Sequence, residues 1–235
     1  ATDQTTDTPT NNFCTYSNEY NRTDLTLSEG NLKCVGDSTW AQTFGTIGVS
    51  TGKWYWEILL DNTGSSTYIK GGFITDIGSV LNTSNNDYLF HVDHALGWAA
   101  YSLAGAIEIR NDSAVISGYA NSDLGDTTFA DGDTLCLALD MTNTRFHFRK
   151  NDGDWLKSGD PAGNSGGLDF TLSDTIGRVC IPACSISVGT CTTNFGSPSF
   201  SISSGNADGD GYGSFEYEPP SGFYALCTKN LAKYG

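Results

Sequence analysis

The stretch Lys53-Trp-Tyr-Trp-Glu-Ile-Leu-Leu60 decides the fold class of this sequence. In an extended strand, successive side chains point to opposite faces, so Trp54, Trp56 and Ile58 share one face. We expect both tryptophans to fill the core. Outward from this stretch, further short apolar runs alternate with Gly, Asn and Asp turn signals, and they predict strands at 69–74, 88–92, 97–103, 106–110, 114–117, 133–140, 145–150, 178–188, 190–195 and 223–227.

The composition agrees with an all-β fold. The chain has 235 residues with 28 Gly, and few stretches carry the Ala, Leu, Glu and Lys mixture that favours helices. Its formal net charge of -15 opposes binding to a nucleic-acid backbone, which needs clustered cations. No apolar run approaches the roughly 18 residues of a membrane helix, so we expect neither nucleic acid nor membrane insertion.

The chain reads as one domain with a polar leading segment. Residues 1–12 predict an extended N-terminal arm or linker, and residues 13–235 a single domain that ends in a strand at 223–227. No fixed-period repeat is visible, which disfavours a solenoid or a propeller.

Seven cysteines have no zinc-ligand spacing. Cys136 and Cys227 lie in apolar runs, where a free cysteine commonly serves as a small buried hydrophobe. The odd count leaves at least one thiol without an intrachain partner. Spacing alone does not decide whether some of the others form disulfides.

Four ordered motifs over residues 43–200 resemble the SPRY family, within the concanavalin A-like sandwich group. The first motif is a G-K-x-Y-W-E strand at Gly52–Glu57. The second is a G-D-x-x-x-x-x-L-D strand at Asp131–Asp140 with its F-x-x-N-G partner at Arg145–Gly153. The last two are a P-A strand at Ile181–Ala183 and an N-F-G…F ending at Asn194–Phe200. The resemblance implies an antiparallel β-sandwich. Cys136 stands where the family usually has Gly, which suggests altered local packing.

The flanking sequences are similar to SPRY-containing structural proteins of aquatic bacteriophages. The similarity lies in residues 7–15, 27–33 and 220–231. It implies a virion surface or tail-fibre-type protein. SPRY modules generally bind ligands through variable loops at one end of the sandwich, so no binding residue carries over to this chain.

The segment Asn206-Ala-Asp208-Gly-Asp210-Gly-Tyr212 fits the first half of a calcium loop. Oxygen ligands alternate there, and the Tyr212 carbonyl would contribute the next one. Position 12 is Tyr217 instead of the usual bidentate Glu, and we expect no helices around the loop. The alternative is a solvated hairpin loop without metal.

Aromatic residues near turns are candidates for stacking on a sugar ring. Trp155 follows the Asn151–Asp154 turn, and Tyr88 follows Asp87 in a polar loop. We therefore predict Asp87, Tyr88 and Trp155 as ligand-binding residues.

Catalytic signatures lack their partners. Gly163-Asn-Ser165-Gly-Gly167 matches G-x-S-x-G without the strand-turn-helix context that the motif needs. His91-Val-Asp93-His94 could offer metal ligands, but the sequence shows no third and fourth ligand to complete a metal site. The carboxyl pairs Glu57 with Asp61 and Glu216 with Glu218 do not reproduce the glycosidase pattern. We expect no enzyme, and a polysaccharide-active enzyme of jelly-roll type is the second alternative.

The sequence therefore predicts a non-catalytic structural and binding module of a virion appendage or extracellular fibre. It would self-associate or bind other virion or fibre subunits, and it would recognise a host-surface carbohydrate or a neighbouring subunit. The first alternative is a purely architectural subunit, whose N-terminal arm adds a strand to a neighbour's exposed sheet edge.

Overall fold

The structure is a computed structural model that describes residues 10–19, 25–62, 68–75, 95–101, 106–111, 114–115, 129–170 and 179–235. Its elements in chain order are β1 Leu25–Ser28, β2 Lys33–Phe44, β3 Lys53–Asn62, β4 Tyr68–Ile74, β5 Ala95–Tyr101, β6 Ala106–Asn111, β7 Ala114–Val115, β8 Thr134–Asp140, β9 Arg145–Lys150, the short 3-10 turn η2 Leu156–Ser158, β10 Leu168–Asp169, β11 Ile181–Asn194, β12 Asn206–Ala207, β13 Ser214–Phe215, β14 Tyr224–Ala225 and helix α2 Thr228–Tyr234.

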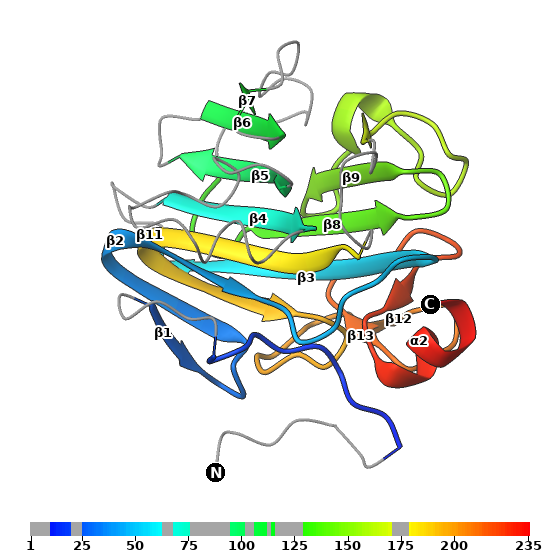
Figure 1. The fold of residues 1–235 in the computed structure, drawn as a ribbon, viewed down its shortest axis with the longest axis horizontal. Coiled ribbons are helices and arrows are strands. Elements are labelled where there is room, and N and C mark those ends of the chain that lie inside the picture. Colours follow the sequence, from blue (N-terminus) through cyan, green and yellow to red (C-terminus); the bar gives the residue numbers. More distant parts are fainter. Residues whose placement is uncertain are drawn as a thin grey trace.

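The strands form an antiparallel β-sandwich whose two sheets share β2 and β11. The first half of β11 pairs with β4, and its second half pairs with β3, with a register irregularity against β2 between Ile186 and Val188. One sheet has the order β10-β9-β8-β3-β11, and the other continues from β11 through β4, β5, β6 and β7. Figure 1 shows β4, β5 and β6 stepping away from β11, and β8 and β9 stepping away from β3. The predicted all-β fold is confirmed.

The core lies between these sheets. Trp54, Trp56 and Ile58 are completely buried on the inner face of β3, as the alternation predicted. Phe73 of β4 meets Phe146 of β9 edge-on, with ring centroids 5.2 Å apart. Gly71 of β4 leaves room for Ile58 of β3, because a Cβ at Gly71 would lie 2.5 Å from the Ile58 side chain.

The outer face of β3 is covered by the C-terminal segment. Tyr55 and Glu57 point away from the sandwich core but are fully buried, because Phe215, Phe223 and Ala225 pack over this face. Since a strand with one face in the core often exposes the other, this second layer is the main feature that alternation alone does not reveal.

Several element boundaries differ from the prediction. Residues 178–188 and 190–195 were predicted as two strands, but a single bent strand, β11, spans them. The long strand β2 was not predicted, because Gly and polar residues divide its apolar positions. The predicted strand at 88–92 lies outside the described residues.

The C-terminus was predicted to end in a strand at 223–227. The strand there is β14, parallel to β3 with Tyr224 opposite Trp54; Cys227 forms an isolated bridge with Phe13, and α2 follows. The strands β12 and β13 flank the 206–212 loop, in line with the expectation of no helices around it, but the unpredicted helix α2 packs against the loop. Among the described residues, no helix is long and apolar enough to cross a membrane.

The last residues of the predicted N-terminal arm are bonded to α2. The Asn12 N–H donates to Thr228 Oγ1 at 3.0 Å, and the Thr228 N–H donates to the Asn12 carbonyl at 2.9 Å. The Lys229 N–H donates to Asn11 Oδ1 at 3.2 Å. This part of the arm therefore belongs to the folded domain, while residues 1–9 lie outside the described ranges.

All seven cysteines are buried in the structure, and all are free thiols that form no disulfide. Cys136 and Cys227 have no exposed surface, which confirms that they are buried in the fold. Both pack in the outer layer over β3.

Candidate binding site at the C-terminal helix

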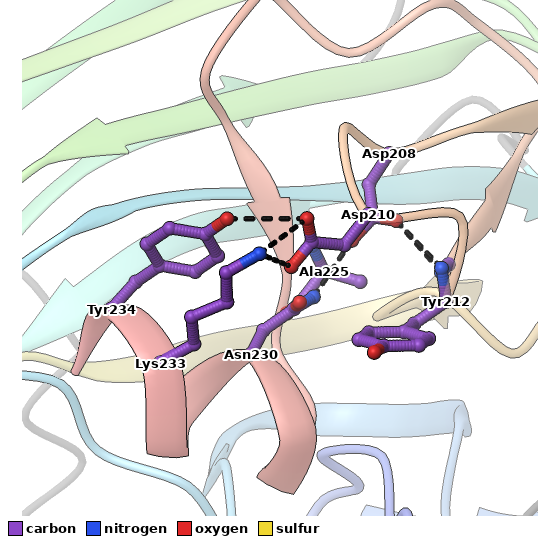
Figure 2. Close-up of polar contacts among 8 residues, drawn as sticks. Asp208, Asp210, Tyr212, Ala225, Asn230, Lys233 and Tyr234 are labelled. Atoms are coloured by element: carbon purple, nitrogen blue, oxygen red, sulfur yellow. Dashed lines mark hydrogen bonds and ion pairs between the residues drawn. The ribbon is translucent and has the colours of Figure 1, made fainter.

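The predicted calcium loop lies against α2. It begins in β12, turns through Asp208–Gly211 and returns in β13. Figure 1 places this hairpin beside the helix, and Figure 2 shows Asn230 reaching from α2 toward Asp208. The loop and the helix therefore form one local unit.

Asp208 holds this unit together. Its Oδ1 accepts hydrogen bonds from the backbone N–H groups of Tyr212 at 2.8 Å and Gly213 at 3.1 Å. Its Oδ2 accepts from the Ala225 N–H at 2.9 Å and from Asn230 Nδ2 at 2.7 Å. Only 5% of the residue is exposed. Both oxygens are thus occupied by protein donors from the loop, β14 and α2.

The other predicted calcium ligands have separate partners. Lys233 Nζ lies 2.9 Å from both oxygens of Asp210, and the Tyr234 hydroxyl donates to Asp210 Oδ1 at 3.1 Å (Figure 2). The Asn206 amide donates to the Glu216 carbonyl at 2.8 Å. Neither Asp208 nor Asp210 belongs to a group of three or more potential ligands within the described part of the chain. Calcium binding stays a prediction, and it would require these donors to be exchanged for the ion.

A pocket of about 430 Å³ opens beside this unit. We call it the tyrosine pocket; it is lined by Thr51, Gly52, Lys53, Thr142, Gly222, Tyr224, Lys233 and Tyr234. Its wall combines the start of β3, the β8–β9 turn and α2. Residues from both halves of the chain therefore meet at this pocket.

Two stacked tyrosines form the aromatic part of the pocket. The rings of Tyr224 and Tyr234 are 3.8 Å apart at an interplanar angle of 12°. A hydrogen bond with Tyr234, followed by burial, raises the pKa of Tyr224 to about 12. Tyr234 and then Asp210 raise the pKa of Lys233. At neutral pH the pocket therefore presents the neutral phenol of Tyr224 beside the charged ammonium of Lys233.

A second ion pair borders the pocket at Lys53. Its Nζ lies 2.9 Å from Asp140 Oδ2, and the Asp140 side chain is fully buried. Burial opposes ionisation of Asp140, but hydrogen bonds from Asn143 and Lys53 outweigh burial and lower its pKa. The carboxylate thus fixes Lys53 at the pocket wall with its charge balanced.

The Gly52-Lys53 motif closes the pocket against the helix. Gly52 has φ +82°, and a Cβ there would lie 2.7 Å from the Tyr234 carbonyl oxygen. Thr51 Oγ1 donates to the same carbonyl at 3.0 Å. Sequence reasoning missed this site because α2 was not expected.

Of the predicted ligand-binding residues, Trp155 is described by the structure, and it does not line this pocket. Trp155 is partly buried, with the Arg149 guanidinium 4.7 Å from its ring centroid and His147 edge-on at 6.4 Å. It packs against the outer layer over β3. Asp87 and Tyr88 lie outside the described residues, so their role as ligand-binding residues stays a prediction.

The candidate catalytic groups are engaged elsewhere. Ser165 lies in a loop, bridged to Asp160 by two backbone hydrogen bonds, and the chain continues into β10 instead of a helix. Glu57 is buried under the backbone of residues 216–217, whereas Glu216 accepts hydrogen bonds from Ser203 at the surface. His91, Asp93 and His94 lie outside the described residues.

Comparison with known proteins establishes the fold. No protein-family model matches the sequence, and no curated protein matches it significantly. Solved structures do: the PSpry domain of TRIM65 superposes with a TM-score of 0.50 at 12% identity, covering 77% of this chain and 92% of that domain. The SPRY domain of human HERC1 superposes with a TM-score of 0.50 at 14% identity, covering 76% of this chain and 96% of that domain. The chain therefore has the β-sandwich fold of SPRY domains.

Proposed function

We propose that this chain is a non-catalytic binding module that recognises a carbohydrate in the tyrosine pocket. The observation that carries this proposal is the pocket's lining, which combines the stacked rings of Tyr224 and Tyr234 with two ion-paired lysines, Lys53 and Lys233. Binding sites of this kind combine a concave aromatic surface with a few fixed polar groups.

The lining suits a neutral polyhydroxylated ligand better than an ion. Lys53 and Lys233 are each paired with a carboxylate, so the two cations bring little unbalanced charge. Sugar hydroxyls both donate to carboxylates and accept from ammonium groups, and the C–H faces of sugar rings pack on tyrosine. Lys233 keeps 57% of its side chain exposed and is therefore accessible to such a ligand.

The absence of catalysis is supported by how two buried carboxylates, those of Glu57 and Asp208, are used. Glu57 and Asp208 each accept four hydrogen bonds from the protein, which leaves no lone pair placed for proton transfer to a ligand. The fold shared with SPRY domains agrees with a binding role by analogy.

The setting we propose is the surface of a virion appendage or an extracellular fibre, where the carbohydrate would belong to a host cell and the chain would self-associate or contact other subunits. The similarity of the flanking segments 7–15, 27–33 and 220–231 to bacteriophage structural proteins supports this setting. A purely architectural role is the alternative proposal. Glycan binding would favour the binding module over this alternative.

Glycan-array binding with matched variants tests the proposed function. We expect the wild-type protein to bind a defined subset of glycans, and Tyr234→Ala to weaken that binding at least about tenfold. Tyr212→Ala is the matched control, because Tyr212 is 41% exposed and lies outside the pocket. Absence of glycan binding, or an equal loss in both variants, would overturn the assignment of the pocket.

A further inference from the structure

Three cysteines from distant parts of the chain meet in the core. The sulfurs of Cys34, Cys184 and Cys191 all lie within 4.8 Å of one another, and Cys184 Sγ is 3.6 Å from Cys191 Sγ. At most 1% of any of the three residues is exposed. Within the described part of the chain, this is the one group of three or more potential metal ligands that converges.

The shared strands of the sandwich create this cluster. Cys34 on β2 and Cys191 on β11 are direct antiparallel register partners. Cys184 lies on the first half of β11, which pairs with β4 in the other sheet. Because β11 changes sheets between these positions, two cysteines seven residues apart on one strand face each other inside the core.

The spacing fits sulfurs around one ion. Two sulfurs bound tetrahedrally to a zinc ion at about 2.3 Å lie roughly 3.8 Å apart. A disulfide would need about 2.05 Å and would use only two of the three sulfurs. The Tyr16 hydroxyl, hydrogen-bonded to Thr193 Oγ1 at 2.9 Å, lies beside the thiols and is the oxygen available for a fourth position.

We propose that Cys34, Cys184 and Cys191 bind a thiophilic divalent metal ion of the zinc class. Binding breaks three S–H bonds, forms three metal–sulfur bonds and releases three protons to solvent, because the thiolate is the form of cysteine that binds the metal. The divalent ion offsets two of the three thiolate charges and leaves one negative charge at the site. Because the site is sealed, the ion enters as the chain folds, and its binding energy contributes to folding.

Refolding with a spectroscopic probe tests the proposal. The full chain is unfolded in denaturant with reductant, refolded with or without one equivalent of Co²⁺, and desalted. We expect about one Co²⁺ retained per chain by mass spectrometry, thiolate-to-metal charge-transfer absorption and a higher midpoint of thermal unfolding. These measurements use the wild-type chain, so they do not depend on a variant that folds.

Cysteine variants then locate the ion. Cys34→Ser should abolish Co²⁺ retention, whereas Cys136→Ala, an equally buried cysteine outside the cluster, should retain it. Refolded wild-type protein that retains no Co²⁺ would overturn the proposal. So would an intact mass lower by two hydrogens with Cys184 and Cys191 joined, in protein purified without reductant.

Discussion

The carboxylate of Glu57, fully buried on β3, accepts a hydrogen bond from the backbone N–H of Tyr217 at 2.8 Å. The Glu216 N–H donates to the same carboxylate at 3.0 Å, and the Tyr55 hydroxyl and the Asn194 amide complete the set. Burial raises the pKa of Glu57, and these four hydrogen bonds oppose the rise. One acidic side chain thus joins the C-terminal layer to the central sheet.

Replacing Glu57 by Ala should lower the free energy of unfolding by about 3 kcal/mol, because four buried donors lose their acceptor together. Urea denaturation followed by tryptophan fluorescence measures this loss. Glu218→Ala, an exposed glutamate in the same segment, should change stability by less than about 0.5 kcal/mol. Equal stability of the two variants would show that Glu57 does not anchor the layer.

Asp208 and Asp210 are expected to respond differently to the same substitution. Asp208→Asn places an amide among four hydrogen-bond donors and should cost about 2–3 kcal/mol in unfolding free energy. Asp210→Asn mainly loses the pair with the exposed Lys233 and should cost less than about 1 kcal/mol. Thermal and chemical denaturation of both variants check the ranking, and a reversed order would contradict it.

The sequence predicted local features well and long-range ones poorly. The inward face of β3 could be predicted at Trp54 and Trp56, because the period-two alternation of a strand depends only on residues that are neighbours in the sequence. The same holds for the β8–β9 hairpin, whose strands are joined by a short turn.

Features that join distant segments could not be predicted in this way. The helix α2 has only seven residues, too few to show a helical period, and it is held by Asp208 and by Asn12 from other parts of the chain. The tyrosine pocket depends on that helix. The cysteine cluster likewise depends on β11 changing from one sheet to the other, and the spacing of Cys184 and Cys191 in the sequence does not predict that change.

Calcium at the Asn206–Tyr212 loop, if it binds, must compete with Lys233 for Asp210. Lys233→Met removes this competitor and should lower the Ca²⁺ concentration needed for half of the thermal stabilisation. Melting temperature followed during Ca²⁺ titration of both proteins measures the change. No shift in either protein at millimolar Ca²⁺ would eliminate this loop as a calcium site.

Two N-terminal deletions should differ in stability. Deleting residues 1–12 removes the hydrogen bonds that Asn11 and Asn12 make with α2, whereas deleting residues 1–9 leaves them. We expect a lower melting temperature for the longer deletion. The shorter deletion is therefore the cleaner test of assembly, and it should retain glycan binding if the tyrosine pocket is the site. Equal melting temperatures would mean that these bonds add nothing to stability.

His147 is the residue from which we expect a distinct acid sensitivity. It is fully buried beneath Gly167 and beside Trp155, and neither ring nitrogen has a hydrogen-bond partner among the residues that the structure describes. Burial lowers the pKa of His147 to about 4; Asp140 and Asp160 raise it, while Arg145 and Lys53 lower it further. The imidazole is therefore neutral in the folded protein at neutral pH.

An unfolded histidine binds its proton near pH 6.5, so between about pH 6.5 and pH 4 the unfolded state holds one more proton than the folded state at this site. The free energy of unfolding therefore falls as the pH is lowered from about 6.5 to about 4, and His147 alone accounts for about 3 kcal/mol of this fall. His147→Phe keeps a ring of similar shape that cannot titrate, so its stability should fall less over the same range. Urea denaturation of both proteins at several pH values isolates the histidine, because the acidic groups are common to both. Parallel curves would show that His147 does not contribute to acid sensitivity.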